Sequence, residues 1–306
     1  MGHARFILQL PATAANLGPG FDTLGIAMTL HNTFEVTPEG AAHVLLNEGF
    51  SAPDLADPGK NLFVRAYEQT CRRHGVESVP LRVRAVNRVP MLAGIGSSAT
   101  AIVGGVAAAY EVHDLTRDRM AMLRDALALE SHPDNIGACL FGGFIAAIVS
   151  ETGPMLSRTD ITYPLLLWVI LPQRVVSTEE SRNRLPKLVS AADAVYSLSR
   201  ASLLTAAFIK GDMSMLDEAM KDRLHEPYRM DPLMEYPVLK ERLRGEEFFG
   251  WAVSGSGPAV IALCSRVSPR LRNEVEEHFA ARGVDFCTYE LGVDNAGLVV
   301  SDVADA

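Results

Sequence analysis

A short glycine loop that leads into an alanine-rich stretch is the feature that most limits how this chain can fold. Residues 90–100 read Pro-Met-Leu-Ala-Gly-Ile-Gly-Ser-Ser-Ala-Thr. Residues 97–110 predict a buried helix whose small side chains and two glycines permit close packing on a sheet. Glycine lets the backbone adopt positive φ and approach a ligand, and a helix start offers free N–H groups and a favourable dipole to an anion. The loop therefore predicts a phosphate site, although not a Walker loop, because no Gly-Lys-Ser/Thr follows the glycines.

The size and charge of the chain narrow its class. A chain of 306 residues suits two domains of about 150 residues each, and loop-forming residues at 151–154 place the boundary between residues 153 and 154. A net charge of −9 argues against a nucleic-acid partner, which normally meets a basic face. No run of about 18 apolar residues occurs, so no membrane span is expected. Residues 1–20 carry no apolar signal core, so no signal segment is expected either.

The cysteines indicate a reducing, cytoplasmic location. They lie far apart and form no C-x-x-C pair, so we expect small buried thiols and neither disulfides nor a zinc site. The four are Cys71, Cys139, Cys264 and Cys287.

Hydrophobic periodicity predicts a mixture of strands and helices. In the first half, strands are expected at 5–10, 33–37, 44–47, 81–86 and 145–149, and helices at 61–74, 97–110 and 117–129, the last with Thr116 as its N-cap. In the second half, strands are expected at 165–171, 250–253, 259–264 and 285–291, and helices at 179–185, 191–210, 213–224 and 269–282. Helices interleaved with strands that return beside one another favour a two-layer α+β sandwich there.

Four separated motifs occur together in the chain. They are Pro11-Ala-Thr-Ala-Ala-Asn-Leu-Gly-Pro-Gly-Phe-Asp-Thr-Leu-Gly25, the loop at 90–100, Glu130-Ser-His-Pro-Asp-Asn135 and Ser254-Gly-Ser-Gly-Pro258. In this combination the chain resembles the GHMP superfamily of small-molecule kinases, named for galactokinase, homoserine kinase, mevalonate kinase and phosphomevalonate kinase. The first motif and His-Pro-Asp-Asn resemble the homoserine kinase branch in particular.

The resemblance implies a fold and a reaction. The fold would be an α+β two-domain GHMP kinase, with a ribosomal protein S5 domain 2-like, ATP-binding domain at 1–153 and a ferredoxin-like domain at 154–306. The reaction would be ATP-dependent phosphorylation of the side-chain hydroxyl of L-homoserine, a step towards threonine, with Mg²⁺ as cofactor in a homodimeric enzyme. Two alternatives stay open: a related kinase that acts on another small alcohol, and a non-catalytic relative that binds nucleotide or amino acid as a sensor.

The resemblance also implies which residues hold the charged groups of L-homoserine. Asp22 would pair with the ammonium group. Arg182 and Arg229 would hold the carboxylate, because the planar guanidinium fork pairs with both oxygens of a carboxylate. Taken alone, either arginine is an ordinary solvated surface charge.

A second set of residues would act on the hydroxyl group. Asn16 and Thr178 would orient the hydroxyl oxygen, with Arg182 as the third catalytic residue. His132 and Asn135 match substrate-side polar positions. The alternative for Asn16 and Asp22 is a structural role, because such residues often hold turns through bonds to their own backbone. His132 likewise has a structural alternative.

The nucleotide would lie along the glycine loop. Asn61 matches a position that contacts adenine, while Ser98 and Glu130 would be Mg²⁺ ligands. The alternatives are a helix N-cap for Asn61 and a surface charge at a helix end for Glu130. The loop residues expected to bind ATP are Pro90, Leu92, Ala93, Gly94, Ile95, Gly96, Ser97, Ser98, Ala99 and Thr100.

Overall fold

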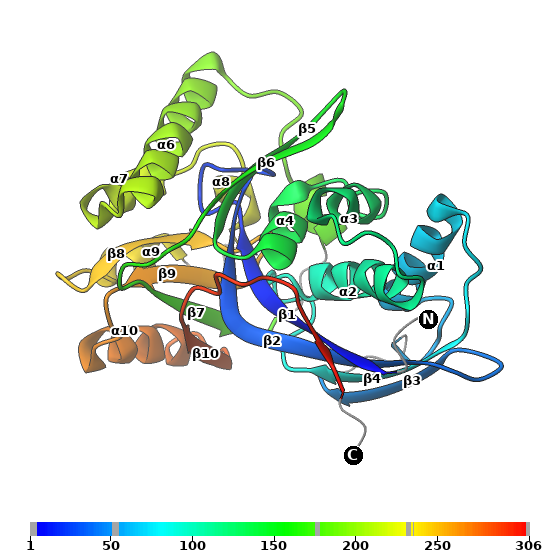
Figure 1. Ribbon diagram of the computed structural model, residues 1–306. Coiled ribbons are helices and arrows are strands. Elements are labelled where there is room, and N and C mark those ends of the chain that lie inside the picture. The colour runs from blue at the N-terminus through cyan, green and yellow to red at the C-terminus, as the bar shows by residue number, and fades with distance from the viewer. Residues whose placement is uncertain (1–4, 51–54, 175–177, 231–233, 235, 304–306) are drawn as a thin grey trace.

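Two sheets organise the computed structural model, which describes residues 5–50, 55–174, 178–230, 234 and 236–303 (Figure 1). Within these residues the first sheet has seven strands in the order β11-β1-β2-β4-β3, with β5 paired to β2 and β6 to β5. The second sheet has four strands in the order β10-β7-β9-β8. The predicted α+β class is confirmed. The strands of the first sheet are β1 (Phe6–Ala15), β2 (Leu24–Pro38), β3 (Val44–Gly49), β4 (Leu81–Asn87), β5 (Phe144–Ser150), β6 (Gly153–Thr159) and β11 (Val299–Asp302).

Helices cover one face of the first sheet and enclose its core (Figure 1). The two glycines of α2 allow it to approach another helix, rather than only the sheet as predicted. A Cβ on Gly105 would lie 2.1 Å from the carbonyl oxygen of Phe63 in α1, and one on Gly104 would lie 3.1 Å from the Phe63 ring. The helices are α1 (Leu62–His74), α2 (Ser97–Val112), α3 (Arg119–Ala126) and α4 (Pro133–Phe141).

The second sheet is antiparallel and alternates its side chains between two cores. Trp168 and Ile170 face α9 and α10, while Leu167 and Val169 face α6 and α7. Figure 1 shows α10 on one side of this sheet and α6 with α7 on the other. The strand order is the one expected for a ferredoxin-like sandwich. The elements are β7 (Leu166–Pro172), α5 (Thr178–Asn183), α6 (Ala191–Lys210), a 3₁₀ turn (Met213–Met215), α7 (Leu216–Ala219), α8 (Glu226–Arg229), α9 (Tyr236–Arg242), β8 (Phe248–Val253), β9 (Val260–Cys264), α10 (Pro269–Ala280) and β10 (Phe286–Leu291).

Two predicted helices were wrong in their extent. The helix expected at 117–129 is the shorter α3, and its N-cap is Asp118, whose side chain accepts the N–H of Met120, rather than Thr116. The helix expected at 213–224 stops at Ala219. Asp222 explains this second difference, because its carboxylate accepts the backbone N–H groups of the next turn and begins a new segment there.

The first sheet includes two strands, β6 and β11, that lie at or beyond the expected domain boundary in sequence. The division between residues 153 and 154 falls at the start of β6, which pairs with β5 along its whole length. Strand β11, from the other end of the sequence, pairs with β1. The exact division into domains stays a prediction. All four cysteines are free thiols, and no helix among the described residues has the length and apolar character needed to cross a membrane.

The close approach of α1 and α2 gives a stability prediction. Helix propensity alone would make Gly105→Ala stabilising by up to about 1 kcal/mol. The clash with the backbone of Phe63 should instead lower the free energy of unfolding by about 2 kcal/mol. Urea unfolding of the variant measures the sign directly. Gly59→Ala is the matched control, since its Cβ would meet only an oxygen of Asp57 at 3.4 Å, and it should change the free energy by less than about 0.5 kcal/mol.

Candidate active site

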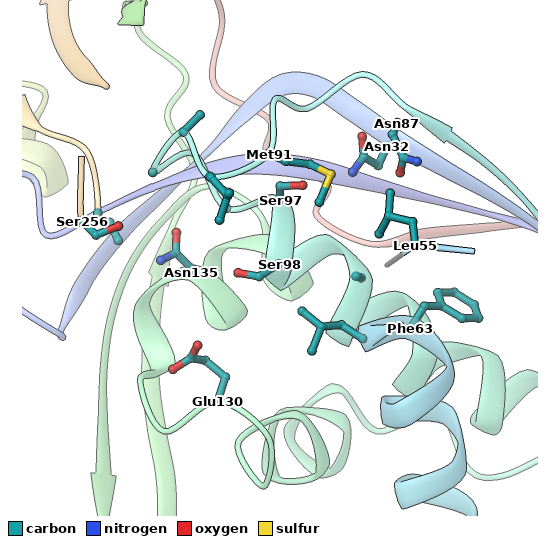
Figure 2. Close-up of a pocket in the computed structure, with 18 of the residues that line it drawn as sticks. Asn32, Leu55, Phe63, Asn87, Met91, Ser97, Ser98, Glu130, Asn135 and Ser256 are labelled. Atoms are coloured by element: carbon teal, nitrogen blue, oxygen red, sulfur yellow. The ribbon is translucent and has the colours of Figure 1, made fainter. Parts of the chain in front are cut away.

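A cavity of about 460 Å³ collects the four sequence motifs. Figure 2 shows side chains from the loop before α2, the start of α4 and the loop after β8 around this cavity. The predicted site residues that line it are Asn16, Asp22, Asn61, Leu92, Ala93, Gly94, Gly96, Ser97, Ser98, Glu130, His132, Asn135, Arg182 and Arg229. The remaining predicted residue of the substrate side, Thr178, begins α5, but its side chain lies outside the described residues.

The glycine loop is shaped for close backbone packing and for an anion. Gly94 and Gly96 have φ of 77° and 76°. A Cβ on Gly94 would lie 2.4 Å from the carbonyl oxygen of Ser254, and one on Gly96 would lie 1.9 Å from Oγ1 of Thr13. Gly96 is the N-cap of α2 and supplies no side-chain bond to its first N–H groups. These groups and the helix dipole therefore face the cavity ready for phosphate oxygens.

Four of the predicted loop residues direct their side chains elsewhere. Thr100 is buried, accepts a hydrogen bond from Asn32 and donates one to the carbonyl oxygen of Ser97. The buried side chains of Ile95 and Ala99 belong to the hydrophobic cores, and Pro90 is also buried. Contact of these four residues with a nucleotide stays a prediction that concerns their backbone only.

Asn16 has a structural role in the first motif. It is buried, with a φ of 72°. Its Nδ2 donates to the carbonyl oxygen of Gly255 at 2.9 Å, and its Oδ1 accepts the N–H of Asp22 at 3.0 Å. The turn-holding alternative is therefore the one the structure displays. The second N–H of the amide remains for a substrate oxygen, so that role stays a prediction.

The acid and one arginine of the predicted substrate site, Asp22 and Arg182, are in direct contact and do not lie at separate ends of the cavity. Nη2 of Arg182 donates to Oδ1 of Asp22 at 2.8 Å, and Nη1 of Arg229 donates to the carbonyl oxygen of Gly255 at 2.8 Å. The Nε atoms of both arginines are buried without a hydrogen-bond partner in the described part of the chain. Both arginines line the cavity, so their guanidinium groups give this wall the positive charge that suits an anionic ligand.

His132 lies between two acids, Glu130 and the same Asp22 that pairs with Arg182. Its Nδ1 lies 2.7 Å from Oε1 of Glu130, and its Nε2 lies 3.7 Å from Oδ2 of Asp22. The hydrogen bond to Glu130 raises the pKa of His132, burial opposes the shift and the Asp22 carboxylate adds to it. Burial would raise the pKa of Glu130, but its bonds to His132 hold that pKa below its usual value. Glu130 is therefore an ionised carboxylate rather than a free surface charge.

The positions of Ser98 and Glu130 are compatible with the predicted Mg²⁺ site. In Figure 2 the hydroxyl of Ser98 points towards the side of the cavity where Glu130 and Asn135 lie. Oxygen ligands of this kind suit Mg²⁺, which usually takes only one or two carboxylates and completes its shell with phosphate oxygens and water. Among the described residues, no group of three or more His, Cys, Asp or Glu side chains is arranged to hold a metal ion by itself.

Asn135 is held by Thr13, whose Oγ1 donates to Oδ1 of Asn135 at 2.7 Å. This bond fixes the amide with its N–H groups free for other partners. Its neighbour Asp134 also lines the cavity, and our sequence analysis missed it. Burial raises the pKa of Asp134 to about 6; the N–H of Asn135 opposes the shift and the Asp22 carboxylate adds to it. Its place in the His-Pro-Asp-Asn motif was the signal that could have found it.

The opposite end of the cavity is more apolar. Asn61 is the N-cap of α1: its Oδ1 accepts the N–H groups of Phe63 and Val64, and its Nδ2 donates to the carbonyl oxygen of Leu55. Its contact with adenine stays a prediction. Neighbouring lining residues come from three strands, β2, β3 and β4, and form no continuous sequence motif. They are Asn32, Phe34, Leu45, Asn47, Val83, Ala85 and Asn87.

The comparisons with known proteins agree with this geometry. Residues 61–143 match the family described as GHMP kinases N terminal domain, and residues 204–281 match GHMP kinases C terminal. The homoserine kinase of Aquifex aeolicus is 36% identical over 272 residues, which cover 88% of this chain and 90% of that protein. The homoserine kinase of Nitratiruptor is 35% identical over 297 residues, covering 97% and 100%.

Solved structures extend the comparison. The crystal structure of homoserine kinase from Cytophaga hutchinsonii has a TM-score of 0.85 at 25% identity, covering 97% of this chain and 98% of that one. The mevalonate kinase of L. major in complex with R-mevalonate shares the fold, with a TM-score of 0.69 at 15% identity and 97% coverage of each chain. From motifs, cavity and relatives together, the chain belongs to the homoserine kinase family of the GHMP kinases.

Proposed function

We propose that this chain transfers the γ-phosphoryl group of ATP to the side-chain hydroxyl of L-homoserine, giving O-phospho-L-homoserine for threonine synthesis. One observation carries the proposal: a single cavity places an uncapped helix start beside an acid and two arginines. The first feature suits ATP, the phosphoryl donor of GHMP kinases. The second suits a zwitterion, as the homoserine kinases among the relatives would require.

The charges of L-homoserine match those of the cavity. The ammonium group would lie against Asp22, with Asp134 as a second negative group in the same wall. The carboxylate would accept from the guanidinium groups of Arg182 and Arg229, which line the cavity. Charge-assisted bonds of this kind are about twice as strong as neutral ones. His132 and Asn135 would complete the substrate side.

The chemical step needs little beyond placement. The hydroxyl oxygen attacks the γ-phosphorus, the bond from phosphorus to the ADP oxygen breaks, and the hydroxyl proton leaves late, to a phosphoryl oxygen. Phosphoryl transfer passes through a loose transition state, so alignment and charge neutralisation supply most of the acceleration. Asn16 and Thr178 would orient the hydroxyl, and Arg182 would stabilise the transferring group. Mg²⁺ held by Ser98 and Glu130 would neutralise charge on the phosphates.

A cytoplasmic location and a homodimer belong to the same proposal. Four free thiols support a reducing compartment. Exposed apolar side chains along α6, among them Val195, Leu198 and Ile209 with exposed fractions of 63%, 67% and 58%, support contact with a second copy. Light scattering of the purified protein gives its mass in solution and decides between monomer and dimer.

A coupled assay with ATP, Mg²⁺ and L-homoserine tests the reaction, with L-serine and mevalonate as competing alcohols. We expect turnover that strongly favours L-homoserine. Preference for another alcohol would support the alternative kinase, and binding of ATP without turnover of any alcohol would support the sensor.

Removal of the charge of Asp22 should weaken the amino-acid substrate alone. We expect Asp22→Asn to raise KM for L-homoserine at least about tenfold, because a charge-assisted bond to the ammonium group is lost, with KM for ATP unchanged. Initial-rate kinetics with each substrate varied in turn measures both constants. Asp285→Asn, on the exposed side chain before β10, is the control and should match the unmodified enzyme. Equal increases in both KM values would contradict the assignment of Asp22.

The pH dependence of kcat/KM should report the ionisation of Asp134. Its pKa of about 6 means that the carboxylate is neutral below about pH 6 and negative above it. As pH falls through 6, the ammonium group loses a negative neighbour, so kcat/KM for L-homoserine should fall with a slope approaching tenfold per pH unit. A pH profile of kcat/KM from 5 to 9 measures this limb. In Asp134→Asn the limb should disappear, and an unchanged profile would assign it to another group.

A further inference from the structure

The ring of Phe21 lies behind the two arginines of the substrate site. The guanidinium carbon of Arg229 is 4.9 Å from the ring centroid, and that of Arg182 is 5.6 Å from it. Both distances fall within the range of a cation–π interaction. Among the described residues that line the cavity, the arginines are present and Phe21 is not. The ring therefore acts on the guanidinium groups rather than on the substrate.

His225 fixes the position of this ring. Its imidazole stacks on Phe21 with 5.0 Å between centroids and 24° between planes. Its Nε2 lies 2.7 Å from the carbonyl oxygen of Gly18, in the same turn as Phe21. His225 is fully buried, and its Nδ1 has no partner in the described part of the chain. Nε2 therefore donates to Gly18. Burial lowers the pKa of His225, although the Asp222 carboxylate, 3.7 Å from Nε2, opposes the shift.

A third contact anchors His225 itself. The buried carboxylate of Asp222 accepts the backbone N–H of His225 and the hydroxyl of Ser197. Asp222 thus ties the segment that carries His225 and Arg229 to α6. The stack on Phe21 is built from a rigid base rather than from a mobile loop.

The two arginines need such a support because they are like charges. Arg182 is among the groups that, after burial, lower the pKa of Arg229, so the two guanidinium groups repel each other. The salt bridge to Asp22 reaches Arg182 only. The face of an aromatic ring attracts both cations without adding a negative charge that would repel the substrate's carboxylate.

We propose that Phe21, held by His225, is a positioning residue that sets Arg182 and Arg229 at the spacing of a carboxylate and so makes the site specific for alcohols that carry one. This inference rests on the proposed function. It deepens that function by assigning the selection for a carboxylate to a residue that does not touch the substrate.

The test compares two alcohols that differ only in the carboxylate, L-homoserine and 3-aminopropan-1-ol. The measured quantity is the ratio of kcat/KM for the first to kcat/KM for the second. We expect Phe21→Leu to lower this ratio about tenfold, through KM for L-homoserine, with KM for ATP unchanged. Phe21→Tyr keeps the ring and should keep the ratio. Phe286→Leu removes a ring that stacks on Phe279 in the other layer and should also leave the ratio unchanged.

Each outcome bears on the proposal. An unchanged ratio in folded Phe21→Leu would overturn the proposal, even if kcat/KM fell equally with both alcohols. If Phe21→Leu does not fold, His225→Gln carries the test, because glutamine can still donate to Gly18 but offers no ring, and the same fall in the ratio is expected. Calorimetric binding of both alcohols separates the two hypotheses: absence of turnover defeats the proposed function, while the ratio of dissociation constants still decides the role of Phe21.

Discussion

The carbonyl oxygen of Gly255 is the acceptor on which the substrate half of the site depends. It receives hydrogen bonds from both Asn16 and Arg229, which come from opposite ends of the sequence. Next to it, Ser254 donates its hydroxyl to the carbonyl oxygen of Gly94 in the phosphate loop. One short loop after β8 therefore joins the turn that contains Asn16, the Arg229 side chain and the glycine loop.

The charged side chains around this loop have different kinds of partner. Asp22 pairs with Arg182, while Arg229 is held by a neutral carbonyl and a neutral ring. Burial raises the pKa of Asp134 to about 6, so its carboxylate loses its charge at mildly acidic pH. Binding of a zwitterion adds one charge of each sign and thereby completes the pairs. That balance explains why an acidic chain can still hold an anionic group firmly.

Local features of the site could be predicted from the sequence, whereas contacts between distant residues could not. Glycines at 94 and 96 announce a backbone conformation that only they tolerate, so the phosphate loop and the start of α2 could be predicted. Asn61 was predicted as either an adenine contact or an N-cap, and its cap bonds are evident. The pairing of Phe21 with His225 joins positions some two hundred residues apart, and no periodicity reports such a contact. Family motifs named residues most of which line one cavity, but they did not predict the bonds among those residues.

The pairing of β11 with β1 has a consequence for how the protein is made. The first sheet lacks this edge strand until residues 299–302 become available to pair with residues 6–9. During synthesis, the ribosome has then already released the segments that form the second sheet. The N-terminal half therefore cannot complete its sheet before the C-terminal half has been synthesised. Until then the outer edge of β1 stays unpaired. Nascent-chain folding is thus coupled across the whole molecule by its last strand.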